Sequence, residues 1–286
     1  MNATATSSRR VLRTVRGQPT SDGAGVKLTR VIGQRDLDMI DPFLMLDEFR
    51  SDQAGDYIAG FPSHPHRGFE TVTYMLAGRM RHRDNQGNSG LLTPGSVQWM
   101  TAGRGIVHSE MPEQEDGLMW GFQLWVNLPA ADKMTAPRYQ DIAPERIPEI
   151  APAEGVRVRV LAGRIGEVAG PVSGVATDPL YLDLELAAGA RFAVPVAAGH
   201  NAFAYVYAGD VHIGPADAAT PVARGELALL AREGDDVLVA AGDAPARLIL
   251  VAGRPLGEPV AKYGPFVMNT PEQIVEAIRD YQSGRF

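Results

Sequence analysis

Apolar and polar residues alternate along much of the chain, and elsewhere apolar residues form short β-branched and aromatic runs. Glycine (31 residues) and proline (21 residues) interrupt these segments at frequent intervals. Short strands between regular turn signals indicate an all-β sandwich or barrel rather than alternating strand–helix units. The predicted strands include 11–15, 71–76, 97–100, 122–126, 156–161, 181–186, 203–207 and 248–251.

One helix is predicted at the end of the chain. Thr270 can cap it, and Pro271 suits its first helical position. Ile274, Val275 and Ile278 then recur at helical spacing.

Segments of the second half of the chain echo segments of the first half in the same order. AFAYVYAG (202–209) resembles TVTYMLAG (71–78), and LILVAGRPL (248–256) echoes FQLWVNLP (122–129). A proline-rich stretch, 137–152, reads as a linker between them. The pattern indicates a duplicated β-barrel, and we expect two domains, residues 1–140 and 141–286.

Composition narrows the possible chemistry. The 286 residues are 45% apolar and 21% charged, which is ordinary for a globular protein. The formal charge of 27 − 34 = −7 argues against nucleic acid or an anionic membrane surface as the main partner. Because cysteine is absent, disulfides, thiolate metal sites, iron–sulfur clusters and a nucleophilic cysteine are excluded. Histidine, aspartate and glutamate remain as strong metal ligands.

The first 21 residues carry several arginines and serines and no acid, a composition faintly like that of a transit peptide. They lack the apolar segment of a secretory signal, and no stretch of the chain approaches the length of a membrane span. We interpret them as a frayed start that leads into the first strand, and we expect a cytoplasmic protein.

Two short motifs carry the candidate chemistry. His64 and His66 flank Pro65, and His108 and Glu110 flank Ser109. Residues two apart on a strand point to the same face, so the two pairs could place four nitrogen and oxygen ligands on one concave surface. Either motif alone is more often a surface feature or a satisfied polar pair in a core. Glycine-rich turns between the motifs strengthen the metal-site interpretation, because they allow the two pairs to fall on neighbouring strands.

Longer motifs around these residues resemble the pirin family of bicupins. The resemblance covers nearly the whole chain and rests on DPFLMLDEF (41–49), FPSHPHRGFETVTY (61–74), PGSVQWMTAGRGIVHSEMP (94–112) and YGPFVMNTPEQI (263–274). It implies an all-β fold of two cupin-type β-barrels (double-stranded β-helix or jelly-roll) in tandem, with a short C-terminal helix. It also implies one non-haem iron in the N-terminal barrel, held by His64, His66, His108 and Glu110. Three imidazoles and a carboxylate suit one divalent ion, Fe(II) but also Mn, Co, Ni, Cu or Zn, and the choice of Fe(II) is what the resemblance implies.

Other polar residues near the motifs have expected roles outside the ligand set. Glu70 matches the glutamate ligand of many other cupins, and we expect it to hydrogen-bond a ligand histidine or to form a structural salt bridge. His82 and Asp84 read as solvated turn residues. Arg104 could reach an anionic substrate, although a backbone carbonyl or an acidic neighbour is the safer partner.

Two groups of residues are expected to be structural. His200 and His212 lie in the second half without a paired ligand, so this barrel is expected to hold no metal. Methionine and aromatic residues near the site should be mostly core, and some could line a pocket for an aromatic ligand. They are Met75, Trp99, Met100, Met111, Met119, Trp120, Phe122 and Trp125.

The resemblance implies quercetin 2,3-dioxygenase activity, an oxidoreductase reaction of flavonoid metabolism. Such an enzyme cleaves a flavonol with O2 and releases carbon monoxide, and Glu110 would accept the proton of the 3-hydroxyl. The expected partners are a flavonol-like aromatic molecule and O2, for a monomeric protein. The alternative is a non-enzymatic, iron-binding, redox-responsive regulator that binds a transcription factor or a metabolic enzyme.

Overall fold

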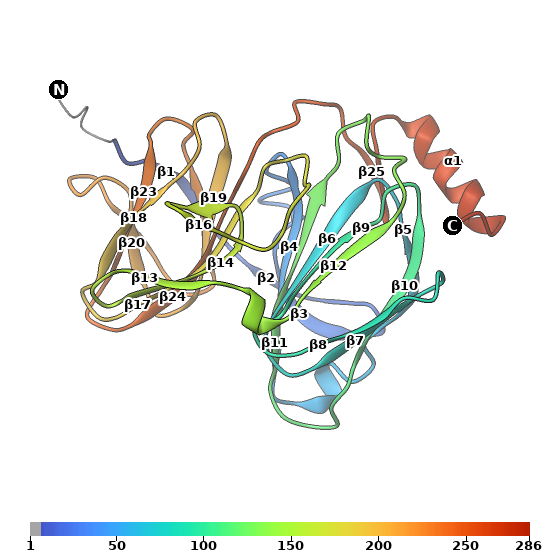
Figure 1. The fold of residues 1–286 in the computed structure, drawn as a ribbon, viewed down its shortest axis with the longest axis horizontal. Coiled ribbons are helices and arrows are strands. Elements are labelled where there is room, and N and C mark those ends of the chain that lie inside the picture. The colour runs from blue at the N-terminus through green and yellow to red at the C-terminus, as the bar shows by residue number, and fades with distance from the viewer. Residues whose placement is uncertain (1–6) are drawn as a thin grey trace. The chain divides into compact units, whose positions relative to one another are not determined.

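The computed structural model describes residues 7–286 and is built almost entirely from antiparallel strands (Figure 1). The described part of the chain forms two compact units. Each contains one seven-stranded and one four-stranded sheet, together with a two-stranded ribbon. This repeated arrangement confirms the all-β, two-barrel fold that the sequence predicts.

The unit that carries the candidate metal ligands comprises residues 18–146 and 256–286. Its large sheet has the strand order β12-β9-β6-β11-β4-β3-β2, and its small sheet has the order β5-β10-β7-β8. Its elements are β2 (Gln18–Asp22), β3 (Val26–Ile32), β4 (Phe43–Ser51), η1 (Ala54–Asp56), β5 (Phe61–His66), β6 (Phe69–Ala77), β7 (Met80–Asp84), β8 (Ser89–Leu92), β9 (Val97–Thr101), β10 (Ile106–Pro112), β11 (Met119–Asn127), β12 (Arg138–Ile142), η2 (Pro144–Arg146), β25 (Ala261–Tyr263), β26 (Phe266–Met268) and α1 (Pro271–Gln282).

The other unit comprises residues 7–17 and 147–255 of the described chain. Its sheets have the orders β1-β22-β19-β24-β17-β14-β13 and β18-β23-β20-β21. Its elements are β1 (Val11–Arg16), β13 (Glu149–Ala153), β14 (Val156–Ala162), β15 (Arg164–Ile165), β16 (Val168–Ala169), β17 (Leu180–Leu186), β18 (Arg191–Pro195), β19 (Asn201–Ala208), β20 (Val211–Ile213), β21 (Thr220–Val222), β22 (Glu226–Leu230), β23 (Asp236–Ala241) and β24 (Ala246–Gly253).

Each terminal segment of the chain belongs to the unit that is built mainly from the other half of the sequence. Strand β1 pairs with β22, whereas residues 256–286 pack on the unit formed by residues 18–146. The domains expected from the sequence, 1–140 and 141–286, therefore differ from these units at both termini. Sequence order cannot reveal this exchange, because it depends on which sheet edge each terminal segment pairs with.

The interiors of the two units differ in polarity. In the unit of β13–β24, alternate residues of β17 (Leu180, Leu182, Leu184 and Leu186) join a continuous buried cluster of valines, leucines and alanines. In the unit of β2–β12, the buried apolar residues are accompanied by the buried polar residues His66, His108, Glu110 and Gln98. An apolar core of closely packed side chains provides no metal ligands, so the interior composition alone separates the two barrels.

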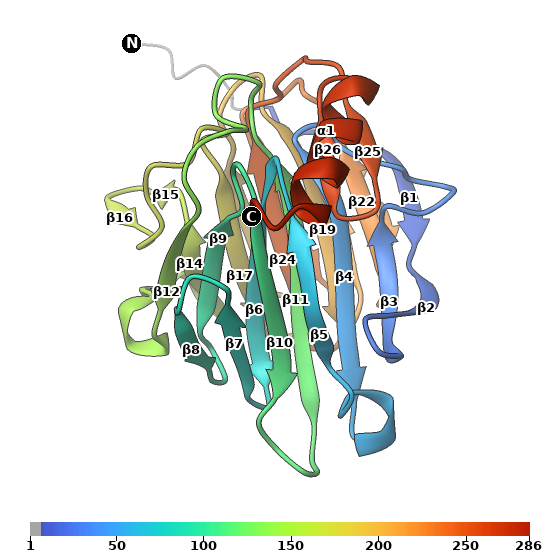
Figure 2. The same cartoon turned by 90° about the vertical axis from the view of Figure 1, so that its right-hand side faces the viewer.

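The predicted C-terminal helix is confirmed as α1. Thr270 and Gln273 form a capping box, in which the Thr270 side chain accepts from the Gln273 N–H at 3.4 Å and the Gln273 side chain accepts from the Thr270 N–H at 3.1 Å. Ile274 and Ala277 are buried against the β25–β26 hairpin, beside which α1 lies in Figure 2. No helix in residues 7–286 is both long and apolar enough to cross a membrane.

Candidate metal centre

The two ligand motifs lie on neighbouring strands of the small sheet. Strands β5 and β10 pair antiparallel, with His64 opposite His108 and His66 opposite Ile106. The register shifts between His108 and Glu110, which lies opposite Phe61. Residues directly opposite each other in a sheet share a face, so the pairing brings His64 and His108 to the same side of the sheet.

The three histidines form a close group. One ring nitrogen from each of His64, His66 and His108 lies within 4.8 Å of the other two. The Nε2 atoms of His64 and His66 are 3.0 Å apart, and the ring centroids of His64 and His108 are 4.5 Å apart. Within residues 7–286, this is the one group of three or more histidine, aspartate or glutamate side chains with such spacing.

The protonation chemistry of the group suits a metal ion. Burial lowers the pKa of His66 and of His108 well below the ordinary value, and the charges of the neighbouring histidines lower both further. A neutral imidazole is the form that binds metals. Both ring nitrogens of His108 are buried without a hydrogen-bond partner. A buried nitrogen with no partner is costly unless something else satisfies it, so these residues fit a divalent cation.

Glu110 lies beside the three histidines but is not a member of the group whose ligand atoms are all mutually close. Its carboxyl group is buried, and burial raises its pKa. Oε1 of Glu110 accepts a hydrogen bond from the Thr73 hydroxyl on β6 at 3.3 Å. The side chain is thus in a position to hold or release a proton next to the histidines.

A cavity of about 850 Å³ opens on these residues. His64, His66 and Glu110 lie on its wall together with Gln123, Asp47 and Arg30. Most of the remaining wall is apolar, and Trp125 also packs its ring 5.3 Å from that of His66. The apolar residues are Ala24, Leu28, Leu44, Met45, Phe49, Phe61, Pro62, Met80, Trp125, Pro265 and Val267.

A row of polar residues crosses the large sheet beneath this cavity. Thr73 of β6 lies opposite Gln123 of β11, Gln123 lies opposite Asp47 of β4, and Asp47 lies opposite Arg30 of β3. Arg30 donates two hydrogen bonds to Asp47, at 2.9 and 2.8 Å, and a third to Asp22 at 2.8 Å. Two carboxylates therefore compensate the charge of Arg30. The sequence does not reveal this row, because its members share a face only through strand register.

Neither interpretation of Glu70 matches the structure. Glu70 is buried on β6, where its Oε1 accepts a hydrogen bond from the Thr101 hydroxyl at 2.6 Å. Burial raises the pKa of its carboxyl group. Thr73, three residues further along the strand, faces Glu110, so Glu70 faces the opposite side of the sheet. Even spacing from His64 and His66 does not place Glu70 on their face, because β5 and β6 belong to different sheets and the turn at Arg67–Gly68 separates them.

His82 is not a solvated turn residue. It lies on β7 directly opposite Glu110, with 1% of its surface exposed. Its Nε2 is 3.2 Å from Oδ2 of Asp141, and its ring stacks on Tyr139 at 5.0 Å. A Cβ on Gly90 would lie 2.1 Å from this Nε2, so glycine leaves the space that the imidazole crosses. In the sequence, the short β8 strand and its Gly90 were the features that could have indicated that His82 is buried.

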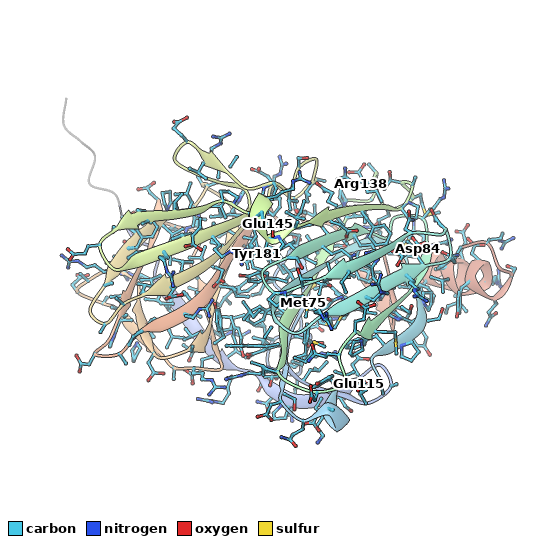
Figure 3. All side chains as sticks on the ribbon, turned by 60° about the horizontal axis from the view of Figure 1, so that its bottom comes forward. Met75, Asp84, Glu115, Arg138, Glu145 and Tyr181 are labelled. Atoms are coloured by element: carbon cyan, nitrogen blue, oxygen red, sulfur yellow. The ribbon has the colours of Figure 1, made fainter. Side chains whose placement is uncertain are left out.

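The remaining candidates lie away from the cavity wall. Asp84 ends β7 (labelled in Figure 3) and accepts hydrogen bonds from the backbone N–H groups of Gln86 and Asn88, as expected of a turn residue. Arg104 has an exposed side chain, and its carbonyl accepts a hydrogen bond from Arg67. In the other unit, His200 is buried with its Nε2 3.5 Å from Asp178, whereas His212 is exposed.

Two antiparallel barrels, one of them with a buried three-histidine group beside a carboxylate, define the molecule as a bicupin with one candidate metal centre. Residues 25–126 match the family model described as Pirin, and residues 181–286 match the model described as Pirin C-terminal cupin domain. The chain belongs to the pirin family.

Relatives extend over the full chain. A pirin-like protein from Caulobacter vibrioides is 55% identical over 281 residues, which cover 97% of this chain and 99% of that protein. Human pirin is 45% identical, covering 98% and 94%. A crystal structure of quercetin 2,3-dioxygenase from Acinetobacter baumannii has a TM-score of 0.89 at 34% identity, with 98% of each chain covered.

Proposed function

We propose that this chain is a metal-dependent dioxygenase that cleaves a flavonol such as quercetin with O2 and releases carbon monoxide. The observation that carries the proposal is the buried histidine group, which lies on the wall of a largely apolar cavity together with a buried carboxyl group. The dioxygenase from A. baumannii, whose fold this chain shares, bears that activity in its name.

The proposed ligands of a single divalent ion, Fe(II) in the first instance, are His64, His66, His108 and Glu110. The lowered pKa of His66 and of His108, and the unpartnered ring nitrogens of His108, support this assignment. When bound, the ion would supply Lewis acidity and, if it is redox-active, electron exchange with O2. Four protein ligands would leave open positions on a six-coordinate ion, as a catalytic site requires.

The cavity suits a neutral, planar aromatic substrate. Its volume of about 850 Å³ lies within the range of about 300 to 1,000 Å³ that small-molecule sites occupy. Apolar side chains can bury the rings of a flavonol. Two cations lie on the wall and both are paired, Arg30 with Asp47 and Asp22, and Lys262 with Asp38. Neither therefore offers an uncompensated charge to an anionic ligand.

Glu110 is the proposed proton acceptor. Its carboxyl group is buried and lies on the cavity wall beside the histidines, where it would be next to a bound flavonol. Thr73 donates to the same carboxyl group and holds its orientation. In the proposed reaction, Glu110 takes the proton of the flavonol 3-hydroxyl, and the surrounding apolar wall excludes bulk water from the activated substrate.

The decisive experiment uses protein loaded anaerobically with Fe(II). With quercetin, it should consume O2, bleach the flavonol absorption and release carbon monoxide. Luteolin lacks the 3-hydroxyl and should be inert. Equal turnover of both compounds would contradict recognition through the 3-oxygen. Full metal loading without turnover of either would favour the alternative, a non-enzymatic regulator that binds a protein partner.

A further inference from the structure

Arg67, which directly follows the proposed ligand His66, is a buried cation. Only 4% of the Arg67 side chain is exposed. A guanidinium removed from water is costly unless it is paired and hydrogen-bonded. Arg67 therefore needs an opposite charge and hydrogen-bond acceptors, and these come from distant parts of the chain.

Arg67 binds three elements at once. Its Nη1 donates to Oδ2 of Asp280 in α1 at 2.8 Å, and its Nε donates to the carbonyl oxygen of Arg104. Its guanidinium carbon lies 4.4 Å from the ring centroid of Phe286. The hydrogen bond from Arg67 also lowers the pKa of Asp280, to which Arg285 binds as well. One side chain thus connects the end of β5, the turn before β10 and the C-terminal helix.

The two turns at this point pack tightly enough to require glycine. The N–H of Gly68 donates to the Gly103 carbonyl at 2.8 Å, which joins the turn after His66 to the turn before His108. A Cβ on Gly68 would lie 1.9 Å from the Val267 carbonyl oxygen, and a Cβ on Gly105 would lie 2.7 Å from the Phe286 ring. The C-terminal segment therefore covers both turns in direct contact, and the C-terminal end lies close to β5 in Figure 1.

We propose that Arg67 is a positioning residue of the metal centre, and that through Asp280 and Phe286 the C-terminal helix sets the spacing of His66 and His108. The inference rests on the ligand set of the proposed function. His66 directly precedes one of these turns and lies opposite Ile106, two residues before His108, which follows the other turn, so a movement of either turn moves the ligand next to it. Ligand geometry must be held closely for tight metal binding, and supporting residues of this kind affect affinity by about 10- to 100-fold.

The test uses Co(II), whose visible absorption reports its coordination, and full-length metal-free protein. Asp280→Asn removes the charge at nearly constant volume, and Phe286→Leu removes the ring that covers Gly105. Both variants should bind Co(II) about 10- to 100-fold more weakly than wild type and show an altered absorption spectrum. Arg67→Lys keeps a cation for Asp280, but its ammonium cannot also donate to the Arg104 carbonyl as the planar guanidinium does. Its Co(II) affinity should therefore lie between that of wild type and that of the other two variants.

The matched control is Asp38→Asn. It removes an ion pair with Lys262 in the same C-terminal segment, but Asp38 is 69% exposed and should leave Co(II) binding unchanged. Lower thermal stability of metal-free Asp280→Asn and Phe286→Leu, with wild-type affinity and spectrum, would overturn the proposal in favour of a purely structural role. Failure of wild type to bind Co(II) would overturn it together with the ligand set. Co(II) binding that depends on His108, without flavonol turnover, would refute only the proposed activity.

Discussion

The hydroxyl of Thr73 lies 3.3 Å from Oε1 of Glu110 and connects the large sheet to the ligand strand β10 of the small sheet. The same hydroxyl lies 2.6 Å from Oε1 of Gln123. Thr73 thus joins the polar row beneath the cavity to the carboxyl group that we propose as ligand and base. The contact also shows which face of β6 points to the site. Glu110 lies on that side, whereas Glu70 lies on the opposite face of β6.

Exchange of Glu110 for glutamine should remove the activity. Glu110→Gln should retain the fold but lose most of its metal and its flavonol cleavage, because an amide is a poor ligand and accepts no proton. Glu70→Gln is the matched control, since it is equally conservative and buried, and it should keep wild-type metal content. Metal analysis and O2 uptake at one pH would check both. A loaded, active Glu110→Gln beside a metal-free Glu70→Gln would refute the assignment of the fourth ligand.

Loss of the Thr73 hydroxyl should weaken the centre without destroying it. Thr73→Val preserves shape and removes the donor to Glu110, so we expect activity or metal affinity to fall by about 10- to 100-fold. The free energy of unfolding of this variant should fall by about 1 kcal/mol, the usual net contribution of one hydrogen bond. Chelator competition and denaturant unfolding would measure the two effects. Wild-type affinity in this variant would show that Thr73 does not orient Glu110.

One metal ion per chain is expected. The described residues contain one group of three close histidines, and the interior of the other barrel is filled by apolar side chains. Elemental analysis of protein purified without a metal-binding tag should therefore approach one ion per chain and fall near zero in His64→Ala/His108→Ala. A reproducible value near two would contradict this.

Lys133 should give the folded protein a specific pH dependence. Burial lowers its pKa from about 10.5 to about 8, and its ammonium donates to Gly68 O, Asn127 Oδ1 and Val267 O. Between these two values the unfolded chain binds more protons than the folded chain, so the contribution of Lys133 to the unfolding free energy should rise with pH. The increase, complete above pH 10.5, should reach about 3 kcal/mol.

The measurement is urea unfolding between pH 7 and 11 for wild type and Lys133→Met. The variant lacks the titrating group and leaves three acceptors without their donor, so it should be less stable at every pH. Its curve should also lack the rise contributed by Lys133. The difference between the two curves removes the contribution of the other titrating groups. A constant difference across this range would show that the pKa of Lys133 is not lowered.

The amino-acid sequence alone determined the class of fold and the location of the candidate chemistry. Alternation of apolar residues and regular turns predicted the strands, and the capping pattern of Thr270 predicted α1, because these signals are local. The H-x-H and H-x-E spacings identified three histidines that the structure brings together, since residues two apart share a strand face.

Only the tertiary structure decided which residues face each other across a turn or between two sheets, because local spacing holds no information about these contacts. The turn at Arg67–Gly68 placed Glu70 on the face away from Glu110 despite matching parity, and pairing of β7 with β10 buried His82 opposite Glu110. The cavity wall combines β3, β4 and the C-terminal hairpin, and Asp280 reaches Arg67 from 213 positions along the chain. Such proximities follow from strand register and packing, which depend on the whole chain at once rather than on any segment of it.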